Sequence, residues 1–246
     1  MNRNAAILTP DERELFDQTV LVRHELEEQY RDLGQQHVTA SVGMWVFLAT
    51  EVMFFGTLFV GLSAYHILYP EAFEKASVKL NWLIGGINTV VLLVSSLFMV
   101  LAVHFARLGN RRLLILFLLL TALLGFVFLV LKGCEYYTDY RDNLIPGWRF
   151  DESEWVSEEV GLRPEQVPHV KLFLTFYWFM TATHGLHVTL GILVVLLMAF
   201  LAWRGRFSER YYSPVDMTGL YWHFVDVVWI FLLPMLYLLG SHSFGG

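Results

Sequence analysis

The sequence predicts an all-α membrane protein, a bundle of five transmembrane helices with an N-terminal amphipathic helix. Of its 246 residues, 56% are hydrophobic and only 16% are charged, and the mean hydropathy is +0.50. Since a soluble domain carries about 25% charged residues, this chain has too little charge for a water-facing surface. Apolar stretches long enough to cross a hydrocarbon core of roughly 30 Å lie at about 41–69, 81–105, 112–132, 170–203 and 217–240.

Residues 1–40 precede the first span and predict an amphipathic helix in a polar, acidic tail, which argues against a cleaved signal peptide. Thr9 and Glu12 have the spacing of a capping box, and Gly34 can end the helix. We expect this helix to pack on its own membrane domain, with docking onto a partner subunit as the alternative. Its apolar side carries Leu15, Val22, Leu26, Tyr30 and Leu33.

Basic residues predict the orientation of the bundle, because cytoplasmic loops are rich in Lys and Arg. The two loops that follow the second and fourth spans are short and basic, which places the N-terminus in the cytoplasm and the C-terminus outside. Their arginines are Arg107, Arg111, Arg112, Arg204, Arg206 and Arg210.

The segment 133–169 is predicted to lie on the outer side. It holds nine acidic and three basic residues, a net charge of −6 that equals the net charge of the whole chain. Its Trp148 and Trp155 predict an ordered cap, and a solvated surface is favoured over a binding site for a basic soluble protein such as a small cytochrome. The overall negative charge argues against nucleic acid as a partner.

Two carboxylates, Glu51 and Asp226, lie well inside the predicted spans. Burying an ionisable side chain in a membrane costs free energy, so both residues are candidates for a functional role. The neighbours of Glu51 in the chain are apolar. We therefore expect a neutral side chain at Glu51, with any polar partner supplied by another helix. On the last span, His223 and Asp226 are three residues apart and predict a His–Asp contact.

On the fourth span, His184 and His187 are predicted to share one face of the helix with Tyr177. Hydrogen bonds between helices are the favoured role for these histidines, with a metal or haem site as the less favoured alternative. The chain has a single cysteine, Cys134, which excludes an internal disulfide and a multi-cysteine metal site.

Three motifs resemble subunit III of the haem–copper terminal oxidases. They are FLATEVMFFG at 47–56, FYWFMTATHGLHVTLG at 176–191 and YWHFVDVVWIFL at 221–232. Lys132, Glu135 and Tyr136 are similar to the Glu-Tyr segment of that family.

The resemblance implies that this chain holds no redox cofactor and packs beside subunit I, in a complex that also contains subunit II. Haem and copper are expected in the partner subunits. The resemblance also implies support of proton uptake by subunit I. Glu51 matches the carboxyl of the family that reacts with dicyclohexylcarbodiimide. A structural polar network is expected from His184, His187, His223, Asp226 and Glu135.

The familiar form of the family has seven helices and a cleft that holds phospholipids, whereas five spans are predicted here. Three questions therefore stay open: whether phospholipid binds, whether another subunit supplies the two further helices, and whether the complex belongs to a respiratory supercomplex.

The function predicted from these features is that of a noncatalytic subunit III of a proton-translocating cytochrome c oxidase, in aerobic respiration at the bacterial cytoplasmic membrane. The alternatives are a quinol oxidase subunit, a homologue associated with nitric oxide reductase, and a location in the mitochondrial inner membrane. From another class comes a proton-coupled transporter that uses Glu51 and Asp226, for which the sequence lacks the expected inverted repeats.

Overall fold

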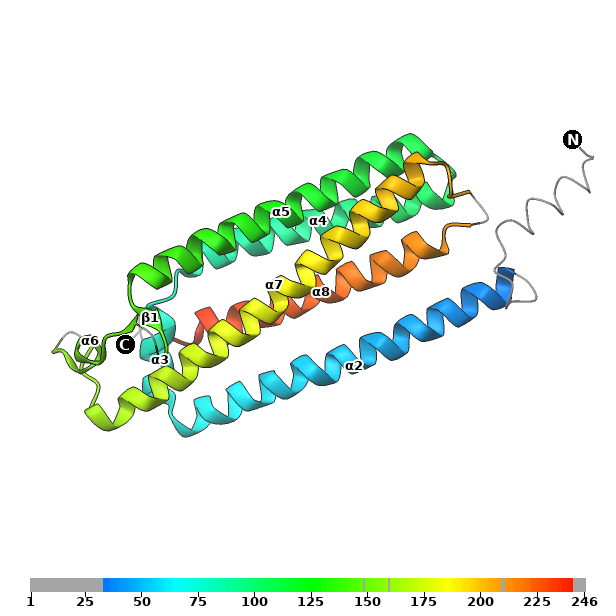
Figure 1. Cartoon of the computed structure of the whole chain (residues 1–246). Coiled ribbons are helices and arrows are strands. Elements are labelled where there is room, and N and C mark those ends of the chain that lie inside the picture. The colour runs from blue at the N-terminus through cyan, green and yellow to red at the C-terminus, as the bar shows by residue number, and fades with distance from the viewer. Residues whose placement is uncertain (1–32, 148, 159, 209–210, 241–246) are drawn as a thin grey trace, which may run out of the picture. The chain divides into compact units, whose positions relative to one another are not determined.

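The computed structural model describes residues 33–147, 149–158, 160–208 and 211–240 (Figure 1). The chain forms two compact units, residues 1–47 and residues 48–246. In the first unit, residues 33–47 are the beginning of helix α2, Leu33–Leu68. Gly34 is part of this helix and does not end one. The predicted tail helix, with Thr9 and Glu12, lies outside the described residues.

Within the described residues, five helices are long and apolar enough to cross a membrane, which confirms the predicted fold class. Their ends differ from the predicted spans by a few residues at most places, and by more at the start of the first span and the end of the third. The helices are α2 (Leu33–Leu68), α4 (Trp82–Arg107), α5 (Arg111–Arg141), α7 (Val167–Trp203) and α8 (Ser213–Tyr237).

In the second unit, α5 packs against α4 and α7, and α8 packs against the same two helices (Figure 1). The turn between α4 and α5 is short because Gly109 adopts a φ of 66° and the Asn110 side chain accepts a hydrogen bond from the backbone of Leu113. Gly205 has a φ of 76° in the connection between α7 and α8. The two basic connections, between α4 and α5 and between α7 and α8, lie at the same end of the bundle (Figure 1).

Trp222 of α8 is the large side chain that three helices enclose, and it is 1% exposed. A Cβ atom at Gly125 of α5 would lie 2.7 Å from its ring, and a Cβ atom at Gly191 of α7 would lie 3.0 Å from it. The indole nitrogen donates to the Ser95 hydroxyl of α4 at 3.1 Å. The two glycines thus make room for an indole whose one donor is satisfied inside the bundle.

The predicted outer segment, residues 133–169, begins too early. Residues 133–141 continue helix α5. The helix does not end where hydropathy falls, because Glu135 and Asp139 find polar partners inside the bundle. The cap that follows contains β1 (Leu144–Ile145), β2 (Arg149–Phe150), α6 (Glu152–Val156) and the 3₁₀ helix η2 (Pro164–Gln166), and α3 (Pro70–Val78) lies at the same end (Figure 1).

The described part of the cap is packed around one of its two tryptophans, Trp155, whereas Trp148 lies outside the described residues. Trp155 is 1% exposed and stacks on Phe150 with ring centroids 6.0 Å apart. Asp151 caps helix α6, where its carboxylate accepts hydrogen bonds from the side chain and backbone of Ser153. These bonds hold the pKa of the Asp151 carboxyl below its usual range.

Candidate functional site

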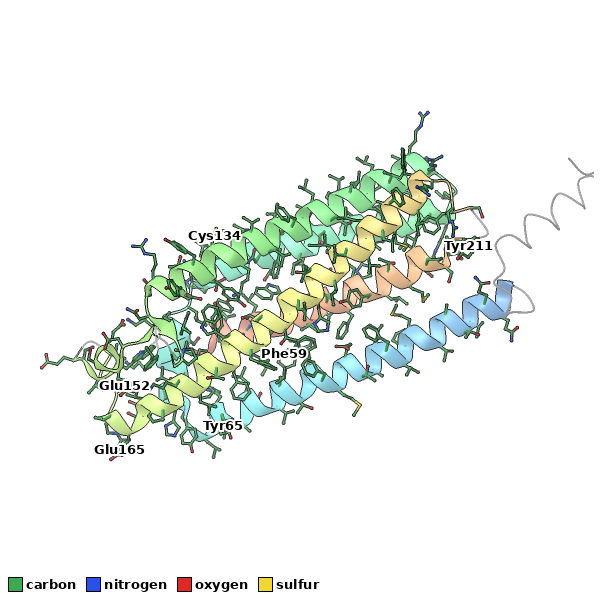
Figure 2. The ribbon with its side chains drawn as sticks, viewed as in Figure 1. Phe59, Tyr65, Cys134, Glu152, Glu165 and Tyr211 are labelled. Atoms are coloured by element: carbon green, nitrogen blue, oxygen red, sulfur yellow. The ribbon has the colours of Figure 1, made fainter. Side chains whose placement is uncertain are left out.

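Glu51 of α2 meets His187 of α7. The Glu51 Oε2 and His187 Nε2 atoms are 3.1 Å apart, and the two side chains are 19% and 16% exposed. The partner of Glu51 thus comes from another helix, as the apolar sequence around it required. Phe55 stands edge-on to the imidazole, and Phe59, two turns along α2 from Glu51, contacts Phe231 of α8 (Figure 2).

The hydrogen bonds of His187 fix how many protons the pair holds. Its Nδ1 atom lies 2.8 Å from the Thr183 carbonyl oxygen, which can only accept, so Nδ1 carries a proton. Nε2 therefore either accepts a proton from a neutral Glu51 or, as an imidazolium, donates one to a carboxylate. In both forms a single proton lies between Nε2 and Oε2, and the pair as a whole is neutral.

A second polar cluster surrounds Lys132 of α5, whose side chain is 5% exposed. Its Nζ atom lies 3.1 Å from Glu135 Oε2, 2.5 Å from the Tyr237 hydroxyl and 3.2 Å from the Tyr177 hydroxyl. Tyr237 donates to Glu135 Oε1 at 2.6 Å, and the Tyr177 hydroxyl lies 2.7 Å from Asp139 Oδ2. The cluster ties α5 to α7 and α8.

The Tyr177 hydroxyl is the centre of this cluster. The Tyr177 oxygen accepts from Lys132 and lies within bonding distance of both Glu135, at 3.0 Å, and Asp139. A hydroxyl has one hydrogen to donate and two lone pairs to accept with. Tyr177 therefore accepts from Lys132 and donates its one hydrogen toward the two carboxylates, Glu135 and Asp139.

His184 has a different environment from His187, although both were predicted to take part in interhelical hydrogen bonds. His184 is 1% exposed and packs against the rings of Phe128 of α5 and Trp229 of α8. Neither ring nitrogen has a hydrogen-bond partner among the described residues. Three residues of a helix turn 300°, so His187 points to α2 while His184 enters the interface of α5 and α8.

The predicted contact between His223 and Asp226 is also wrong. His223 Nδ1 is bonded instead to the Ser96 hydroxyl of α4, at 2.7 Å. Asp226 is 4% exposed, and neither of its oxygens has a hydrogen-bond partner in the part of the chain that the structure describes. The two side chains share a face of α8, as their spacing predicted, but the hydroxyl that His223 bonds comes from α4.

The polar interior of the bundle can therefore hold a proton between Glu51 and His187, and it places the Tyr177 hydroxyl against the Asp139 carboxyl. Across residues 33–147, 149–158, 160–208 and 211–240, no group of three or more His, Cys, Asp or Glu side chains is arranged to hold a metal ion. Cys134 is a free, exposed cysteine (Figure 2).

Comparison with known proteins identifies what this arrangement is similar to. The family described as cytochrome c oxidase subunit III matches residues 170–241, which include α8 and most of α7. The probable quinol oxidase subunit 3 of Staphylococcus haemolyticus is 31% identical over 201 residues, which cover 81% of this chain and 88% of the relative. The protein of that name from Staphylococcus saprophyticus is 30% identical, and that from Staphylococcus aureus strain USA300 is 28% identical, each with the same coverage.

Proposed function

Because the chain belongs to the subunit III family of the haem–copper oxidases, we propose that it is the third subunit of a quinol oxidase. A subunit III implies a complex with other oxidase subunits. The observation that favours quinol over cytochrome c as electron donor is the name that the similar staphylococcal proteins share, quinol oxidase subunit 3. The sequence analysis favoured cytochrome c as the electron donor. The residues of this chain could not decide between the two donors, because the donor site belongs to other subunits.

The role we propose is noncatalytic. Haem and copper lie in the partner subunits, subunit I packs directly on this bundle, and subunit II completes the complex. The chain stabilises subunit I and supports its proton uptake during aerobic respiration, in a bacterial cytoplasmic membrane. The basic connections at one end of the bundle, with Arg107, Arg111 and Arg204, support an orientation with that end in the cytoplasm. The partly exposed Glu51–His187 pair supports a role in holding protons near a partner.

Purification of the complex through a tag on this chain tests the proposal. We expect larger subunits that contain haem and copper to copurify, and the preparation to oxidise a reduced quinol but not reduced cytochrome c. A copper-containing subunit II together with rapid oxidation of cytochrome c would overturn the choice of donor. Recovery of the chain without any haem-containing subunit would overturn the assignment to an oxidase.

Deletion of the chain tests its supporting role. We expect the remaining complex to reduce oxygen at a normal initial rate and then to lose activity over fewer turnovers than the intact complex. The measurement is oxygen consumption against time at equal haem content. Immediate and complete loss of oxygen reduction, with subunit I still assembled, would contradict a noncatalytic role.

A further inference from the structure

A pocket of about 370 Å³ opens between α4 and α8 at the end of the bundle where the short connections lie. Its mouth is formed by Arg107, the last residue of α4, and Asp216 in the first turn of α8, which form an ion pair at 2.8 Å. The Arg107 side chain is 54% exposed. Gly219 and His223 continue the pocket wall along α8, so the pocket leads from a charged rim toward the membrane interior.

Beyond the pocket, polar groups continue in the same direction. His223 lines the pocket and its Nδ1 atom is 2.7 Å from the Ser96 hydroxyl. Asp226 follows His223 by three residues on the same face of α8, which packs against α4, although neither carboxyl oxygen of Asp226 has a hydrogen-bond partner among the described residues. Asp216 and Asp226 are ten residues apart on one helix, which is roughly 15 Å along its axis.

The two helices present these groups as facing rows. On α8 the residues 216, 219, 223 and 226 recur at helical spacing, and on α4 the residues 96, 100, 103 and 107 do the same. No cation balances the Asp226 carboxyl among the described residues of the packed helices: Arg107 is bound to Asp216, and Lys132 of α5 to Glu135. A buried carboxyl without a cation is disfavoured as an anion and keeps its proton.

We propose that the pocket between α4 and α8 is a hydrated inlet, and that Asp226 is a proton-binding site which exchanges its proton with water through Ser96 and His223. A small rotation lets the Asp226 hydroxyl donate to Ser96 Oγ, while the Ser96 hydrogen goes to His223 Nδ1. A water molecule in the pocket takes the proton from the imidazole and the reverse sequence returns one, so each exchange leaves every group as it began. The inlet is independent of which donor the oxidase uses.

Infrared spectroscopy of the purified complex tests the exchange. We expect a carbonyl stretching band of a protonated carboxylic acid that is absent in Asp226→Asn and shifts when the complex is transferred to heavy water. Val100 lines the pocket, so Val100→Trp fills it. We expect this variant to slow the rate of the heavy-water shift about tenfold or more, which corresponds to about 1.4 kcal/mol in the barrier. Absence of the band in the wild-type complex, or an unchanged rate in Val100→Trp, would overturn the proposal.

Leu119→Trp is the matched control. Leu119 lies on α5 ten residues after Gly109, and Val100 lies on α4 nine residues before it. The two side chains are 48% and 50% exposed, but Leu119 does not line the pocket. The control is expected to leave the exchange rate unchanged. An equal slowing by both tryptophans would show a general effect of bulk on the bundle and would overturn the inlet.

Cysteine accessibility tests hydration without a large side chain. In a Cys134→Ser background, we expect Val100→Cys to react with a charged, membrane-impermeant thiol reagent in intact complex, and Leu119→Cys to remain unreacted, since thiolates form in water and not in lipid. Equal reactivity at both positions, or none at Val100, would overturn a hydrated pocket.

Discussion

Replacing Lys132 with methionine is expected to destabilise the bundle by about 3–5 kcal/mol, the usual loss when one partner of a buried ion pair is removed. Lys132 and Glu135 are 5% and 1% exposed, so water cannot replace the missing cation. Tyr237 and Tyr177 would each lose a donor to the hydroxyl oxygen. Because the cluster joins α5, α7 and α8, the loss should be felt by the whole bundle.

The double variant Lys132→Met with Glu135→Gln separates unpaired charge from lost packing. Glutamine keeps an acceptor for Tyr237 and has no charge to leave unpaired, so we expect the double variant to recover most of the stability lost in Lys132→Met. The measurement is the free energy of unfolding in mixed micelles of lipid and denaturing detergent. A double variant as unstable as the sum of its singles would show that the ion pair is not the cause.

The pair Lys171–Glu152 provides the matched control. Its nitrogen and oxygen are 2.5 Å apart, as in a strong contact, but the side chains are 37% and 64% exposed. Water and salt screen such a pair, and it is worth about 0–1 kcal/mol. Lys171→Met is therefore expected to change the free energy of unfolding by no more than about 1 kcal/mol. A loss as large as that of Lys132→Met would contradict the argument from burial.

The Lys132 cluster also shows what sequence reasoning missed. Asp139 was not singled out, and the helix was expected to end at 132, because hydropathy falls there. Yet Lys132, Glu135 and Asp139 stand at spacings of three and four residues, which put them on one face of a continuing helix. That signal was present in the sequence. The contribution of Tyr237, which is more than 100 positions away in the chain, depends on tertiary packing and had no local signal.

The five spans were predictable because each depends on its own composition, and a helix satisfies its backbone hydrogen bonds within its own segment inside a membrane. Contacts between spans were harder. The sequence required a partner for Glu51 on another helix but could not identify His187. Helical spacing suggested Asp226 as the partner of His223, whereas α4 supplies Ser96. In both cases the rotation of one helix against another decides the contact, and many rotations bury equal amounts of apolar surface.

Glu51→Gln is expected to abolish covalent labelling of this chain by dicyclohexylcarbodiimide, while the complex still assembles. The reagent attacks a protonated carboxyl in apolar surroundings. Glu51 can be such a group, since it shares one proton with His187 and is 19% exposed, whereas Asp226 is 4% exposed. The measurement is mass spectrometry of the labelled chain. Undiminished labelling of Glu51→Gln would place the reactive carboxyl elsewhere.

His187→Leu locates the shared proton. In a low-dielectric interior a neutral acid bonded to a neutral imidazole avoids the desolvation cost of two ions, so we expect the proton to reside on Glu51. Leucine removes the imidazole, which is the hydrogen-bond partner of Glu51 and, among its described contacts, the only group that could take its proton. Labelling of His187→Leu should therefore equal or exceed that of the wild type. Loss of labelling would mean that the imidazole activates the carboxyl and that the pair does more than store a proton.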